Sequence, residues 1–195
     1  MSSLRRLTFV LAALVAAGGC DSGTPMGTDP RDDDLFEPGC DLSTAVQVRP
    51  TGTYLRVNDD DPDAPTLIRL ADVGVAPGDR LALERFGEYQ YRFNNDPADV
   101  RREMAAVFSS SNDLLGEGED ERVVNALDAG DDYATPPTRG GGVATDIAED
   151  FQISDSTVVV VPTGAVYLFV APPDDRFRDN ADDDDDYRVC ITEVS

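Results

Sequence analysis

The apolar residues of this chain lie in short, β-branched runs separated by turn residues, and this pattern constrains the fold most. Residues 54–57 and 81–84 alternate apolar and polar side chains, as half-buried strands do. The valine run 158–161 is typical of a strand covered on both faces. About eight runs of this kind predict an all-β fold, an antiparallel β-sandwich or jelly roll of about 8 strands.

One segment carries the pattern of a helix instead. Asp96 is a suitable N-cap, Pro97 suits the first helical turn, and apolar residues from Val100 onward recur on one face. The sequence therefore predicts one short helix near residues 97–105 within the β fold, which can continue into a strand at residues 105–109.

The first twenty residues predict export from the cytoplasm. Arg5 and Arg6 precede an apolar stretch and a small-residue site that ends at Cys20. This stretch is shorter than the roughly 20 apolar residues that a membrane span needs. The pattern resembles a bacterial lipobox, which implies cleavage before Cys20 and lipidation of its thiol. An ordinary signal peptide that happens to precede a cysteine is the alternative.

The expected organisation has three parts. Residues 1–19 are a lipoprotein signal peptide, residues 20–39 are a disordered tether that begins with the lipidated cysteine, and residues 40–195 are the β-sandwich domain. We expect the chain in the cell envelope, anchored to a membrane by its N-terminal lipid, on the periplasmic or the outer surface.

Two further cysteines, Cys40 and Cys190, lie near the two ends of the predicted domain. Two thiols in an exported protein most simply form one disulfide. Two free, buried thiols are the alternative. A disulfide between Cys40 and Cys190 is therefore predicted.

The composition excludes several functional classes. The chain contains no histidine, so it holds no Ser-His or Cys-His nucleophile pair and no zinc site that depends on imidazole. Its formal net charge of −23 repels nucleic acid and attracts divalent cations. We expect no nucleic-acid partner, and contact with a membrane through the lipid anchor alone.

Acidic residues are densest between the last two predicted strands. Asp174, Asp179 and Asn180 are separated by a short segment, and a tight loop can aim their three side-chain oxygens at one point. Calcium prefers six to eight hard oxygen ligands in flexible geometry. The spacing indicates a Ca²⁺ site at these residues, whereas the run 182–186 is interpreted as a solvated turn.

The segment "VPTGAVYLFVAPPDDRFRDNADDDDDYRVCIT" resembles the calcium-binding end of the galactose-binding, PA-I-type bacterial lectins. The resemblance implies a galactose-binding-domain-like jelly roll with Asp174, Asp179 and Asn180 as side-chain ligands. It also implies backbone carbonyl ligands from Arg178 and from Tyr91.

Two departures limit what the resemblance implies. The loop before Asp179 is two residues shorter than in the galactose lectins, and the chain lacks the histidine through which those lectins hold part of the sugar. Tyr89 is a second candidate for the aromatic carbonyl donor. The resemblance therefore implies calcium binding more strongly than galactose specificity.

The predicted function is non-catalytic recognition of a glycan through a calcium held in the loop. Asp174 and Asp179 would also accept hydrogen bonds from sugar hydroxyls, and the ring of Phe177 or Tyr187 would pack on the sugar.

Two other functions stay open from the sequence. The chain can be a structural or adhesive envelope module in which calcium only stabilises the fold. It can also be a glycoside hydrolase that uses Glu149 or Asp150 opposite Asp174, although acidic pairs arise by chance in so acidic a chain.

Overall fold

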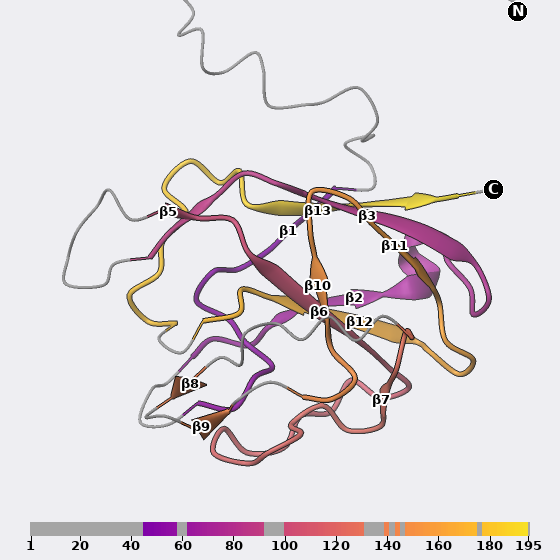
Figure 1. Cartoon of the computed structure of the whole chain (residues 1–195), viewed down its shortest axis with the longest axis horizontal. Helices are drawn as coiled ribbons and strands as arrows, with labels where there is room; N and C mark the ends of the chain where they lie inside the picture. The colour runs from indigo at the N-terminus through magenta and orange to yellow at the C-terminus, as the bar shows by residue number, and fades with distance from the viewer. Residues whose placement is uncertain are drawn as a thin grey trace, which may run out of the picture.

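The computed structural model describes residues 45–57, 62–91, 100–130, 139–140, 143–144, 147–174 and 177–194. These residues form antiparallel sheets joined by turns and loops, and the two larger sheets pack against each other (Figure 1). The prediction of an all-β antiparallel sandwich is therefore confirmed. No helix among the described residues is long and apolar enough to cross a membrane.

The first sheet has four strands within the described residues, in the order β1-β13-β3-β11. Their bounds are β1 (Ala45–Gln47), β13 (Arg188–Glu193), β3 (Arg80–Phe86) and β11 (Thr157–Val160). The last strand, β13, lies between β1 and β3, so that Cys190 is opposite both Ala45 and Glu84. The C-terminal strand is thus held on both sides.

The second sheet has the order β10-β6-β12-β2, and β7 also pairs with β6. Its strands are β10 (Phe151–Ile153), β6 (Met104–Ser109), β12 (Tyr167–Ala171), β2 (Thr66–Arg69) and β7 (Ala126–Leu127). Two small pairs complete the strands: β4 (Tyr89–Gln90) with β5 (Val100–Arg101), and β8 (Arg139–Gly140) with β9 (Val143–Ala144). A short 3₁₀ turn, η1 (Leu70–Val73), follows β2.

The main core lies between the two large sheets. Leu81 and Leu83 of β3 point into it from one sheet, and Phe108 of β6 stacks on Phe151 of β10 from the other, with ring centroids 5.6 Å apart. Alternate apolar side chains of β3 and β13 are thereby buried away from water. This burial of apolar surface is the main stabilising contribution of such a core.

A second core covers the other face of the second sheet. Ala105 and Val107 of β6 and Phe169 of β12 pack there against Tyr54 and Phe177, which come from segments outside the strands. Strand β6 is therefore buried on both faces. The prediction of a strand at 54–57 is wrong, because these residues form a bend and irregular backbone, from which Tyr54, Leu55 and Val57 fill the second core.

The helix predicted near residues 97–105 is not present in the described part of that segment. Residues 100–101 form β5 and residues 104–109 form β6, while residues 97–99 lie outside the described residues. The apolar residues of β6 alternate between two cores, and this requirement of packing outweighs the local helix signal. Extended structure suits a run that is apolar on both faces.

The valine run 158–161 is covered less than predicted. Strand β11 is at the edge of its sheet, and Val158 and Val160 point away from the core with exposed fractions of 43% and 49%. Val159 and Val161 face the main core. The prediction of coverage on both faces is wrong for this strand.

Cys190 is fully buried and disulfide-bonded. Its partner cysteine lies outside the described residues, so the pairing with Cys40 stays a prediction. The signal peptide, the tether and the lipidation of Cys20 also fall outside the described residues.

Candidate metal centre in the loop before the last strand

The chain between β12 and β13 crosses from one sheet of the sandwich to the other. Phe177 anchors this loop, because its side chain is fully buried in the second core. The backbone NH of Asn180 donates to the carbonyl of Phe177, over 3.2 Å, and closes a turn. The side-chain amide of Asn180 donates to the carbonyl of Pro50, over 3.0 Å. The loop is thus attached both to the core and to the segment after β1.

Three side-chain oxygens of this loop are buried and accept no hydrogen bond: Asp174 Oδ2, Asp179 Oδ1 and Asn180 Oδ1. Both aspartates take part in other interactions within the chain, so the oxygen that matters most is that of Asn180, a side chain only 5% exposed. A buried acceptor without a hydrogen bond costs about 1–3 kcal/mol. A hard cation is a partner that suits amide and carboxylate oxygens equally.

The structure brings Tyr91 next to this loop. Gln90 and Ala181 exchange two backbone hydrogen bonds, of 2.7 and 3.1 Å. In an antiparallel pair, the residues that follow such a hydrogen-bonded pair lie opposite each other at a Cα separation of about 4.5 Å. Tyr91 directly follows Gln90, so we expect its backbone near Asn180, and its role as a calcium ligand stays a prediction. Its ring is directed to Arg101, whose guanidinium lies 4.8 Å from the ring centroid.

Asp174 lies near strand β4, which contains Tyr89 and Gln90. Burial raises the pKa of the Tyr89 hydroxyl, and the negative charge of Asp174 raises it further. Asp174, itself 5% exposed, is therefore close to Tyr89, one residue from the pair that holds Ala181. Tyr89 packs in the main core against Tyr187. Arg178 lies in the turn after Phe177 with its side chain exposed.

Phe177 and Tyr187 do not have the role that was predicted for them. Both side chains are fully buried, and the Tyr187 hydroxyl donates to the carbonyl of Glu103. Neither ring can therefore pack on a sugar that arrives from solvent. Tyr187, Val189 and Ile191 all face the main core, so the two-residue period of β13 is the signal that could have placed Tyr187 inside.

Residues 183–185 of the acidic run are exposed, as the interpretation as a solvated turn expects, but the run also brings three carboxylates together. The carboxylates of Asp182, Asp184 and Asp186 have oxygens that all lie within 4.8 Å of one another, and this group could hold a metal ion. Asp182 accepts from the backbone NH groups of Asp186 and Tyr187, over 3.1 and 3.2 Å. Asp186 accepts from the backbone NH of Glu88, over 3.1 Å. The turn is therefore structured by its own carboxylates.

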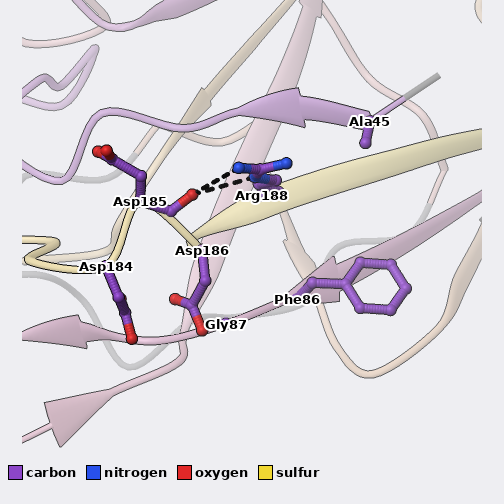
Figure 2. A pocket seen from close by; sticks show the side chains of 7 residues that line it. All are labelled: Ala45, Phe86, Gly87, Asp184, Asp185, Asp186 and Arg188. Carbon is purple, nitrogen blue, oxygen red and sulfur yellow. Dashed lines mark hydrogen bonds between the residues drawn. The ribbon is translucent and has the colours of Figure 1, made fainter. Parts of the chain in front are cut away.

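A small pocket of about 110 Å³ adjoins this turn (Figure 2). Figure 2 shows Asp184 and Asp186 beside Gly87, and the guanidinium of Arg188 directed at the backbone carbonyl of Asp185. The guanidinium holds the turn against the start of β13 without neutralising the carboxylates of Asp184 and Asp186.

Crowding of carboxylates changes the acidity of this turn. Burial raises the pKa of Asp182 to about 6, and a hydrogen bond with Asp184 contributes to the increase. Burial also raises the pKa of Asp186, and the charge of Asp184 adds to it. At neutral pH these groups lose protons against mutual repulsion, which a bound cation would relieve.

We expect Asp184→Asn to raise the free energy of unfolding of the metal-free protein by about 1 kcal/mol at pH 7, a figure reduced for solvent screening. The folded-state pKa of Asp182 is above its unfolded value of 3.8. The stability that protonated Asp182 contributes is therefore complete below pH 4 and is lost as the pH rises through about 6. Urea denaturation in chelator at pH 4 and pH 7 measures the effect, which should vanish at pH 4.

Asp183→Asn is the matched control, because it removes the same charge from the same turn but lies outside the group of three carboxylates. An equal gain in stability from both substitutions would show that net charge, and not the group, is responsible.

The carboxylates proposed for hydrolysis do not line an open cleft. Asp150 is 4% exposed, and the hydroxyl of Tyr54 donates to its Oδ2 over 3.4 Å. Glu149 is half-buried in the turn that precedes β10. This arrangement gives no support to glycoside hydrolysis.

Comparison with known proteins finds no family model, no curated protein and no solved structure that matches the chain. The resemblance to the PA-I-type lectins therefore stays a prediction.

Proposed function

We propose that this chain is an exported, lipid-anchored calcium-binding domain that recognises a carbohydrate without catalysis. Calcium would be held by the side chains of Asp174, Asp179 and Asn180, with backbone carbonyls from Arg178 and Tyr91. The fold would be a jelly roll of the galactose-binding-domain type.

The observation that carries the proposal is the environment of Asn180. Its side chain is 5% exposed, its amide NH₂ is held by the carbonyl of Pro50, and its Oδ1 is buried without a hydrogen bond. The amide is thus fixed in orientation with the oxygen directed away from its hydrogen-bonded end. The loop also buries one carboxylate oxygen of Asp174 and one of Asp179, and both aspartates take part in other interactions within the chain.

When bound, calcium would supply the positive charge that compensates these oxygens and orders the loop. Residues of the chain itself hold the loop in position. Phe177 fixes the loop to the second core, and the pair formed by Gln90 and Ala181 keeps Tyr91 near the loop. Because Phe177 is fully buried and the Asn180 amide is held by Pro50, we expect the loop to be ordered before any cation arrives.

A structural role for calcium is the second candidate function, and one observation favours it. The oxygens of the proposed ligands are almost inaccessible, and both aromatic rings predicted to contact a sugar are buried. In this case the module would be structural or adhesive, and calcium would only stabilise its loop.

Reciprocal coupling separates the two functions. If a glycan binds next to the cation, a saturating glycan must raise the calcium affinity by the same factor by which calcium raises the glycan affinity, about 5- to 150-fold. A glycan array with and without chelator identifies the ligand, and calorimetric calcium titration with and without it measures the factor. If calcium raises the melting temperature but no glycan binds, the structural function holds.

A further inference from the structure

A groove of about 530 Å³ opens beside the proposed calcium loop. One wall is formed by residues 47–51, which follow β1, and the other is formed by residues 180–182 and Asp185. This volume lies in the range of about 300–1,000 Å³ that is usual for small-molecule sites. The groove therefore has room for a ligand of one or two rings.

The walls of the groove are fixed by hydrogen bonds. The backbone NH of Val48 donates to the carbonyl of Tyr187, over 2.9 Å, and the amide of Asn180 donates to the carbonyl of Pro50. Gln47 Nε2 donates to Asp185 Oδ1 over 3.0 Å and links the two walls. The site is thus formed before a ligand binds.

Asn180 connects the groove to the proposed calcium site. It forms part of the wall and is 5% exposed, and its side-chain NH₂ is held by the carbonyl of Pro50 in the opposite wall, while its Oδ1 is buried behind the wall. The same residue is a proposed calcium ligand, so a molecule in the groove would lie next to the cation.

The polar groups of the groove select the class of ligand. Arg49 supplies hydrogen-bond donors: its backbone NH is fixed by the hydroxyl of Thr66, while its side chain is exposed at the groove. Asp182 and Asp185 supply acceptors. Hydroxyl groups both donate and accept, so a ring that carries several of them satisfies both walls. An anionic ligand would be repelled by the two aspartates and by the strongly negative chain.

We propose that this groove binds a neutral, polyhydroxylated ring, with Arg49 on one side and the carboxylates of Asp182 and Asp185 on the other. The inference rests on the proposed function, because it gives the carbohydrate its place beside the calcium loop. It also moves the sugar contacts away from Phe177 and Tyr187, which are buried.

The test uses the full chain saturated with calcium and the methyl glycosides of galactose, glucose and mannose as probes. Amide shifts in ¹H–¹⁵N spectra should cluster at residues 47–51 and 180–185. Arg49→Ala should weaken binding of the preferred probe about 10-fold or more, because hydrogen bonds from a charged donor are lost. Calorimetry should show that the calcium affinity of this variant is unchanged.

Arg80→Ala is the matched control, since Arg80 is an exposed arginine at the far end of β3. It should change neither affinity. Shifts that cluster elsewhere, an Arg49→Ala variant that binds the probe as tightly as the wild type, or a calcium-loaded chain that binds none of the probes would each overturn the groove assignment. The calcium site of the proposed function is judged separately, by the calcium titration of the unmodified chain.

Discussion

The double substitution Asp174→Asn with Asp179→Asn is expected to lower the calcium affinity about 100-fold or more. Both changes keep the size of the side chain but remove two negative charges from the ligand set, and the number of charged ligands is what mainly sets calcium affinity in such loops. The oxygens involved are buried, so water cannot replace the lost attraction effectively. Calorimetric titration of both proteins measures the change.

The effect of calcium on thermal stability should also differ between the two proteins. Asp174 and Asp179 take part in other interactions within the chain, so the melting temperature of each protein in chelator serves as its own reference. At a free calcium concentration of 100 times Kd, the wild type gains about 2.7 kcal/mol, which raises its melting temperature by about 5–10 °C. The double variant should show no such rise. Because each protein is compared with itself in chelator, this result separates loss of a ligand from a defect in folding.

Asp72→Asn with Asp128→Asn controls for net charge, because both residues are outside the loop. Asp72 is exposed, and the hydrogen bond from the NH of Gly130 to Asp128 Oδ1 can be kept by an amide oxygen. Equal calcium affinity in the wild type and in the loop variant would contradict the assignment. The group of Asp182, Asp184 and Asp186 would then be the site to test, and Asp184→Asn should weaken calcium binding.

The strands that could be predicted are those with one buried face. The alternation at Leu81 and Leu83 reports directly which side of β3 faces the core. For residues 104–109 the period left both a helix and a strand open, because a run that is buried on both faces has no polar positions to decide between them. The second core that buries it is built from residues distant in sequence.

The candidate site also has a part that could be predicted from the sequence and a part that could not. The proposed side-chain ligands of the loop, Asp174, Asp179 and Asn180, are close in sequence, so the calcium prediction could be made from their spacing alone. The pair between Gln90 and Ala181 joins segments about 90 residues apart in the chain, and no local pattern encodes it. The burial of Phe177 likewise depends on the second core and not on its acidic neighbours.

Gly87→Ala is expected to destabilise the protein by about 3 kcal/mol. Gly87 has a φ of 70°, a left-handed conformation that costs other residues about 1–2 kcal/mol. A Cβ at this position would also overlap the backbone carbonyl and the carboxylate of Asp186, and overpacking of this kind adds about 1–3 kcal/mol. The turn would have to move and would lose the hydrogen bond from Glu88 to Asp186. Urea denaturation in chelator measures the loss.

Gly164→Ala separates the two causes, because Gly164 has a φ of 89° but no atom near the position of an added Cβ. It should cost only the conformational part, about 1–2 kcal/mol. The excess at Gly87 then measures how tightly the end of β3 packs against the acidic turn. If both variants lost the same stability, the turn would be free to move away, and the clustering of its carboxylates would not depend on that contact. An excess at Gly87 would instead show that the absence of a side chain there is what allows Asp186 to approach β3 and join Asp182 and Asp184.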